Sequence, residues 1–401
     1  MKPVPILPAE TAATSGNAVR PVRAAIGALT TTIACSVPVF LVGGLAVQIS
    51  DELNFSPAGL GLAVSAYFGA SALASVPAGA LVERYGSTRI SRAAIGLAAA
   101  SLLTIALVAS SLWSLIAILA LGAAANAMGQ LASNTSLARH VPTRRQGLSF
   151  GVKQAAIPVS TLLAGAAVPL VALTVGWRWA FVAAAVGATA ALWLVPVEKE
   201  EKHRARATPG SRATAALVVI GVAATLASGA ANALGTFLVD SAVGRGMAPG
   251  PAGLALTLGS AVCVAARVGG GWQADRFPSR QVGVIAGLLA AGAAGLGLLA
   301  VSGTVPLVAG VVLGFGFGWA WPGLMNFAVV RLHPQAPAAA TSITQTGVYA
   351  GGCLGPLGLG SLAAATGYST MWTVAAVAMM LAAAFMVLGS RMLQRHVAAQ
   401  S

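Results

Sequence analysis

The sequence predicts an all-α membrane protein with twelve transmembrane helices in two pseudo-symmetric six-helix bundles. Three observations lead to this fold class. The chain is 57% hydrophobic and only 8% charged, whereas a soluble domain carries about a quarter charged residues. Its apolar residues form runs of about 20, the length at which a helix crosses a bilayer. Similar polar patterns also recur at a fixed offset in the two halves of the chain.

The apolar runs define the predicted helices in order. The first six are expected near residues 24–48, 59–82, 92–110, 112–137, 148–173 and 179–196. The second six are expected near 213–239, 251–272, 281–302, 305–330, 339–365 and 369–390. The polar stretch EKEEKHRARATPGSR predicts a solvated linker between the sets. The resulting division is a tail at 1–23, an N-terminal bundle at 24–197, a linker at 198–212, a C-terminal bundle at 213–390 and a tail at 391–401.

The distribution of positive charge predicts the orientation. The chain carries 23 Lys and Arg and a net charge of +14. If both termini are cytoplasmic, all but four of these cations lie in cytoplasmic tails, loops and linker, as the positive-inside rule requires. The exceptions are Arg178 and Arg245 outside, and Lys153 and Arg267 within helices. This pattern is typical of loops facing an anionic leaflet, and we expect no nucleic-acid partner.

The N-terminal tail has no apolar core flanked by a cleavage site, so it is interpreted as a cytoplasmic tail and not a secretory signal. The richness in Ala and Gly points to a bacterium with a GC-rich genome. We therefore expect a multi-pass protein of the bacterial cytoplasmic (inner) membrane.

An internal repeat appears at an offset of 192 residues, where GALVERYGSTR corresponds to GWQADRFPSRQ. The offset pairs Gly79 with Gly271, Glu83 with Asp275, Arg84 with Arg276, Asn134 with Asn326, Arg139 with Arg331 and Pro142 with Pro334. One residue out of step, Gln154 corresponds to Gln345. Parallel six-helix repeats place the substrate site at their interface near the membrane midplane, and we expect a cavity there.

The glycine-x-x-x-acid-arginine segment after the second helix of each half resembles the signature of the major facilitator superfamily. The resemblance covers nearly the whole chain, including the 6+6 division and the charged linker. It implies the major facilitator fold, transport by rocking of the halves, and a cytoplasmic charge network that acts as a gate. The implied gate residues are Gly79, Glu83, Arg84, Arg89 and Arg139 in the first half, and Gly271, Asp275, Arg276, Arg280 and Arg331 in the second. By this resemblance Gly79 allows close helix approach.

The chain departs from the family pattern at several positions. Glu83 replaces the usual aspartate, Ser87 and Thr88 replace a basic pair, and Pro278 replaces a glycine. The family's antiport signature is missing from the fifth helix. A similar run, GVYAGGCLGPLGLG, lies in the eleventh helix, where its glycines and proline predict close packing and bending.

Arg267 is the strongest candidate for a substrate-binding residue. It lies eight positions before Asp275, about 12 Å along the helix, where a charged side chain is costly. The segment AARVGGGWQAD resembles a helix of monocarboxylate and oxalate carriers in which an arginine binds the substrate carboxylate. Arg267 therefore binds an anion, takes part in helix packing or gating, or extends to the membrane surface.

Other polar side chains within predicted helices are further candidates. Lys153, beside Gln154, is either a ligand or extends to the cytoplasmic face. Asn126, Gln130 and Asn134 recur every four residues and share one helix face. Asn326 is either a structural hydrogen-bonding residue or a substrate ligand. Gln345 and Tyr349, four residues apart, and also Tyr67, either line the cavity or pack against neighbouring helices.

Trp319 and Trp321 lie well inside the tenth helix. On a continuous helix, residues two apart diverge by about 200°. The two rings are therefore not expected to face the cavity together, and Trp319 is taken as the candidate ligand.

The sequence shows no acidic residue securely at mid-membrane, no catalytic constellation and no metal-ligand spacing among Cys35, Cys263 and Cys353. We expect no enzyme activity, cofactor or metal. The leading hypothesis is a monomeric secondary transporter of a small organic or inorganic anion, with protons as a candidate coupling ion. The alternative is a multidrug or metabolite exporter, and a third hypothesis is a transporter-like receptor.

Overall fold

The computed structural model describes residues 21–197, 214–277, 281–332 and 337–398, without the side chains of Val76, Thr143 and Thr214 and of residues 330–332, 337–343 and 396–398. The predicted linker at 198–212, Arg280 and the Arg331 side chain therefore lie outside the described residues, as does almost all of the predicted N-terminal tail.

The first half contains α1 (Pro21–Gly44), α2 (Ala46–Leu53), α3 (Pro57–Tyr85), α4 (Ser87–Val108), α5 (Leu112–Gly122), α6 (Ala124–His140), α7 (Gln146–Gln154), α8 (Ala156–Ala167) and α9 (Trp177–Ala191). The second contains α10 (Thr214–Val243), α11 (Pro249–Arg276), α12 (Gln281–Leu299), α13 (Thr304–Leu313), α14 (Pro322–Leu332), α15 (Pro337–Thr366) and α16 (Tyr368–Ala398). Short turns are η1 (Thr143–Arg145), η2 (Val168–Ala172), η3 (Leu192–Leu194) and η5 (Gly314–Gly318). In the described chain, 12 helical spans are long and apolar enough to cross a membrane, which confirms the predicted number.

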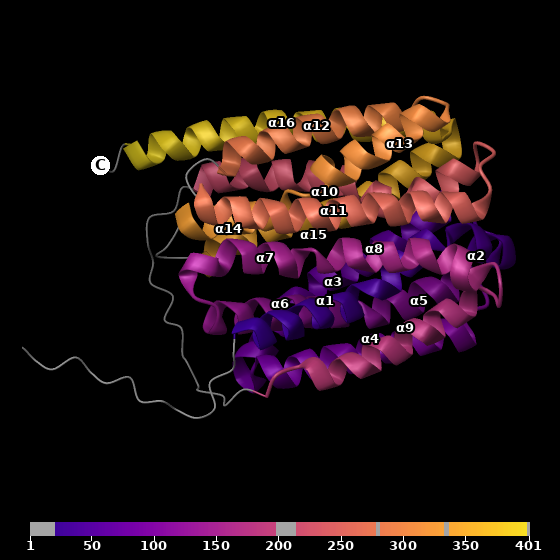
Figure 1. The fold of residues 1–401 in the computed structure, drawn as a ribbon, viewed down its shortest axis with the longest axis horizontal. Helices are drawn as coiled ribbons and strands as arrows, with labels where there is room; N and C mark the ends of the chain where they lie inside the picture. The colour runs from indigo at the N-terminus through magenta and orange to yellow at the C-terminus, as the bar shows by residue number, and fades with distance from the viewer. Residues whose placement is uncertain (1–20, 198–213, 278–280, 333–336, 399–401) are drawn as a thin grey trace, which may run out of the picture.

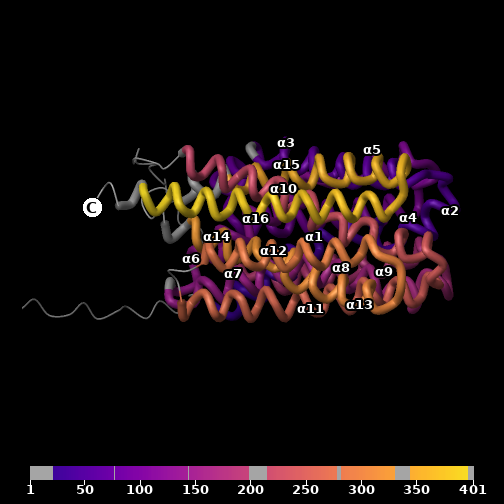
Figure 2. Tube along the Cα trace, turned by 90° about the horizontal axis from the view of Figure 1, so that it is seen from above, coloured from indigo at the N-terminus to yellow at the C-terminus, as the bar shows by residue number. Residues whose placement is uncertain are grey.

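The helices run side by side along the long axis of the molecule, with α1–α9 forming one side and α10–α16 the other (Figures 1 and 2). We call the end at which α16 finishes the C-terminal end. The opposite end carries α2 (Figure 1). The halves meet where α3 packs against α15, α7 and α8 pack against α11, and α1 packs against α10.

Glycines bring the two halves into close backbone contact. A Cβ at Gly61 of α3 would lie 2.2 Å from the carbonyl oxygen of Pro356 in α15. In α15, Gly355 lies equally close to α10, where a Cβ would be 2.3 Å from the Cα of Gly229. The close packing predicted for the glycine-rich run is thus confirmed, and α15 is held against both α3 and α10.

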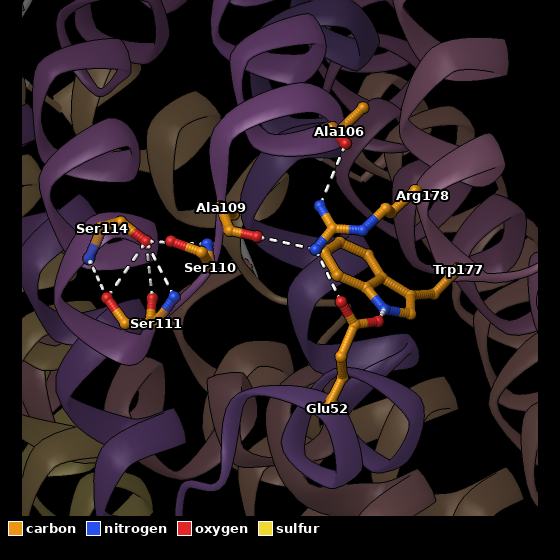
Figure 3. Close-up of polar contacts among 8 residues, drawn as sticks. All are labelled: Glu52, Ala106, Ala109, Ser110, Ser111, Ser114, Trp177 and Arg178. Atoms are coloured by element: carbon orange, nitrogen blue, oxygen red, sulfur yellow. Dashed lines mark hydrogen bonds and ion pairs between the residues drawn. The ribbon is translucent and has the colours of Figure 1, made fainter.

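A polar cluster ties together three helices of the first half at the end opposite the C-terminal end (Figure 3). Glu52 of α2 accepts hydrogen bonds from Trp177 Nε1 at 2.7 Å and from Arg178 Nη2 at 2.6 Å. Arg178 also donates to the carbonyls of Ala106 and Ala109, at the end of α4. The beginning of α5 lies beside this cluster and is capped by the Ser111 hydroxyl.

Candidate functional site

A narrow cavity of about 70 Å³ lies between the two halves. Its polar lining comes from α1, α3, α6 and α7 of the first half and from α10, α11, α14 and α15 of the second, and consists of Ser36, Tyr67, Asn126, Gln130, Gln154, Ser228, Asn232, Arg267, Asn326, Gln345 and Tyr349. Its apolar lining consists of Val39, Phe40, Phe68, Ile157, Trp319, Trp321, Pro322 and Val348. The cavity therefore lies at the interface that the internal repeat predicted.

Arg267 contributes the cation of this cavity lining, and its side chain is only 2% exposed. Its Nε and Nη2 donate to the Trp319 carbonyl at 2.9 and 2.6 Å, and its Nη1 donates to the Gln154 carbonyl. Its Cζ also lies 5.8 Å from the centroid of the Trp319 ring, within cation–π range. These partners are neutral, so they hold the guanidinium in place without cancelling its charge.

Two breaks in the helices expose the carbonyls that Arg267 binds. A proline has no backbone N–H, so the carbonyl four residues before it in a helix lacks its usual donor. Pro158 leaves the Gln154 carbonyl in that position, where α7 gives way to α8. Trp319 has non-helical angles of φ −115° and ψ 4°, between the π-helical turn and α14, so its carbonyl lies outside a regular helix. One guanidinium thus satisfies backbone groups in both halves.

Lys153 does not line the cavity, which contradicts its prediction as a cavity ligand. It also does not extend to the surface, because its side chain is only 1% exposed. Its Nζ donates to Oε1 of Gln130, which does line the cavity. Lys153 therefore lies behind the cavity wall, within the electrostatic field of Arg267. Among the described residues, no Asp or Glu lines this cavity.

Both Trp319 and Trp321 line the cavity, which the sequence argument had excluded. That argument assumed a continuous α-helix. Residues Gly314–Gly318 instead form a π-helical turn, and α14 begins only at Pro322. The 100° step per residue therefore does not hold across residues 319–321, and the two rings reach the same space.

The predicted polar face of α6 reaches the cavity only in part. Asn126 and Gln130 line it, whereas Asn134 does not. Each step of four residues turns the side chain by about 40° and advances it by about 6 Å. Asn134 is two such steps after Asn126, so it points to another side of α6 and lies beyond the cavity. Its Oδ1 is buried without a hydrogen-bond partner in the described structure. Asn326, its counterpart by the repeat, does line the cavity.

Ser36 and Ser228, together with Asn232, line the cavity but were not predicted. Serine and asparagine within an apolar helix give little signal alone, since they bond to their own backbone. The repeat offset would have found the two serines, because they lie 192 residues apart. Phe40 and Phe68 were missed because lining and packing aromatic residues look alike in a sequence.

At the C-terminal end, Asp275 connects the halves. Its carboxylate accepts hydrogen bonds from the backbone N–H groups of Gly147, at 2.8 Å, and Leu148, at 2.9 Å, in the first turn of α7. A negative charge at a helix N-terminus is stabilising. Gly271 permits this approach, since a Cβ there would lie 2.6 Å from the Gly147 carbonyl oxygen.

The described structure shows no such contact for Gly79, Glu83, Arg84, Arg139 or Arg276. A Cβ at Gly79 would meet no described atom within 4 Å, so the close approach expected there is not observed. Arg84 and Arg276 lie over Tyr85 and Trp272 of their own helices. Glu83, Arg89 and Arg139 are exposed. The gate contact between the halves that the described residues show is thus the Asp275 carboxylate at the N-terminus of α7.

Comparisons with known proteins identify the family. The model of the Major Facilitator Superfamily matches residues 25–356, and no curated protein matches the chain. Two crystal structures of a bacterial homolog to the human lysosomal transporter Spinster are similar, both inward-facing. The occupied one has a TM-score of 0.70 at 16% identity and covers 92% of this chain and 96% of that one. The unoccupied one has a TM-score of 0.72 at 15% identity and covers 94% of this chain and 98% of that one.

At this identity the likeness to the solved structures shows the fold alone. The family match spans most of the sequence and the fold agrees with it. The chain belongs to the Major Facilitator Superfamily and is a multi-pass secondary transporter, not an enzyme.

Proposed function

We propose that the protein transports a small organic or inorganic anion, which Arg267 binds in the cavity between the halves. The observation that carries this proposal is the guanidinium itself, which is buried, lines the cavity and has neutral partners. An uncompensated charge is costly inside a membrane protein and usually has a functional role. A guanidinium suits an oxyanion because its fork donates two parallel hydrogen bonds.

The arrangement of the halves supports alternating access. Arg267 donates to a carbonyl in each half, and Asp275 joins the halves at the C-terminal end. An anion that draws the guanidinium away from the Gln154 carbonyl would loosen the contact between the halves beside the cavity. Binding would then favour the rocking motion that moves the substrate across.

The proposal includes the cellular setting. Both termini face the cytoplasm of a bacterium, the inner membrane surrounds the helices, and the protein works as a monomer. Since no described carboxylate lines the cavity, a coupling proton would enter with the anion, or the protein would exchange one anion for another.

Thermal unfolding of purified protein tests the proposal, because a ligand that binds the folded state raises its apparent stability. Acetate, oxalate, nitrate, sulfate and phosphate are compared at constant ionic strength on the wild type, Arg267→Lys and Arg267→Gln. Arg178→Gln is the matched control, because Arg178 also donates to two backbone carbonyls but lies outside the cavity.

We expect at least one anion to stabilise the wild type and Arg178→Gln, to stabilise Arg267→Lys less, and to leave Arg267→Gln unchanged. Equal stabilisation of all four proteins would contradict the proposal. Stabilisation by lipophilic cations alone, through the aromatic lining of Phe40, Phe68 and Trp319, would instead support the multidrug exporter.

A further inference from the structure

Trp321 has a hydrogen-bond donor with nothing to donate to. Its side chain is 1% exposed and lines the cavity. Its Nε1 is buried and has no partner in the described structure. The indole N–H can only donate, and a buried polar group left unpaired costs free energy. Such a group in a substrate cavity points to a ligand that supplies the missing acceptor.

Two other buried tryptophans, Trp177 and Trp372, have partners. Trp177 Nε1 donates to Glu52 at 2.7 Å, and Trp372 Nε1 donates to the Ser241 hydroxyl at 3.3 Å. The folded chain thus provides acceptors for indole groups elsewhere. Of these three tryptophans, only Trp321 lines the cavity, and its N–H is the unpaired one.

Three other donors in the cavity lining are already engaged. The Tyr67 hydroxyl donates to the Cys35 carbonyl at 2.5 Å, and the Ser228 hydroxyl donates to the Val348 carbonyl at 2.8 Å. The Asn232 amide donates to the Ser228 carbonyl at 2.8 Å. Trp321 is therefore a free donor in a narrow cavity whose lining also carries the positive charge of Arg267.

We propose that Trp321 donates its indole N–H to one oxygen of the transported anion while Arg267 holds another. The inference rests on the proposed function and deepens it, since it assigns the ligand as an oxyanion with at least two acceptor oxygens. A carboxylate and an inorganic oxyanion share this chemistry. A halide presents a single atom, so it contacts both donors only if they converge on one point. Trp321 thereby selects oxyanions over halides.

Trp321→Phe tests the proposal because it keeps an aromatic ring but removes the N–H. The matched control is Trp372→Phe, which makes the same change at a buried indole outside the cavity. Binding of acetate, nitrate and chloride is measured by titration calorimetry on the purified full chain at constant ionic strength. Acetate represents organic oxyanions, nitrate inorganic ones and chloride the single-atom case.

In Trp321→Phe we expect the affinity for acetate, nitrate or both to fall by about 10-fold, as for a lost hydrogen bond to a charged group. The affinity for chloride should stay unchanged, and Trp372→Phe should bind like the wild type. Wild-type affinity for oxyanions in Trp321→Phe would overturn the proposal, and equal weakening for chloride would assign the effect to ring volume. If no anion of this panel or of the thermal-unfolding panel binds the wild type, the inference and the proposed anion site both fail.

A measurement on the wild type covers the case in which Trp321→Phe does not fold. In protein labelled with ¹⁵N-tryptophan, one indole N–H resonance should move downfield as acetate or nitrate is added, since it gains a charged acceptor. Indole resonances that stay fixed while the anion binds would contradict the proposal.

Discussion

Arg178 and Arg267 each donate to two backbone carbonyls, yet their surroundings differ. Arg178 also has the carboxylate of Glu52 as a partner and is about one-third exposed, at 34%. Arg267 has neutral partners and is buried. The carboxylate completes the first site within the folded chain. At Arg267 the described chain supplies no such carboxylate, and we assign the negative charge to the substrate.

Glu52→Gln tests the first of these sites. The hydrogen bond from Arg178, followed by the one from Trp177, holds the pKa of the Glu52 carboxyl below its ordinary value. A depressed folded-state pKa adds stability above the unfolded-state pKa of about 4.3, and this stability is lost as the pH falls through the folded-state value. The side chain is half exposed, so solvent screening limits the contribution to about 0.2–1 kcal/mol.

We therefore expect Glu52→Gln to unfold at a slightly lower temperature than the wild type at pH 7, and the difference to vanish in acid and in high salt. Thermal unfolding followed by intrinsic fluorescence from pH 3 to pH 8 measures it. A difference that grows as the pH falls would contradict the stated role of Glu52.

At the scale of helices, the sequence predicted the spans well and their irregularities poorly. Long apolar runs fix the spans because a backbone in lipid must bond within its own helix. The π-helical turn before Trp319 has no comparable signal, and it brought Trp321 into the cavity against expectation. Lys153 was misplaced because periodicity cannot show that Gln130 would accept a hydrogen bond from its Nζ.

The beginning of α7 provides a test at this scale. Asp275→Asn removes the negative charge that faces two N–H groups there, which should weaken the contact by about 1 kcal/mol. Glu83→Gln makes the equivalent change at the repeat-related position, where the carboxyl is exposed, and serves as the control.

Spin labels at the exposed positions Arg144 and Gln273 would report the separation of the halves at the C-terminal end. We expect a larger population of long distances in Asp275→Asn, by about 5-fold in the equilibrium between contact and separation, and no change in Glu83→Gln. Equal shifts in both variants would show that losing a carboxylate charge separates the halves even without a contact to the N-terminus of α7. That result would contradict the role given to Asp275.

Across the whole molecule, the internal repeat predicted where the cavity would form but not how differently the halves would use it. Asn134 and Asn326 correspond by sequence, yet only Asn326 lines the cavity. Gly271 packs tightly where Gly79 does not. Repeats share an ancestral pattern of helices, whereas the cavity lining depends on local breaks such as those at Pro158 and Pro322. The substrate-binding role of the lining residues stays a prediction.

Uptake into proteoliposomes tests the central claim most directly. The radiolabelled anion that stabilises the purified protein is supplied outside vesicles containing the wild type, Arg267→Gln or Arg178→Gln, and its accumulation is followed with time. We predict that Arg267→Gln lowers uptake by at least about 10-fold, since charged hydrogen bonds to the substrate are lost, while Arg178→Gln transports like the wild type. Uptake by Arg267→Gln at the wild-type rate would contradict the claim that Arg267 binds a transported anion.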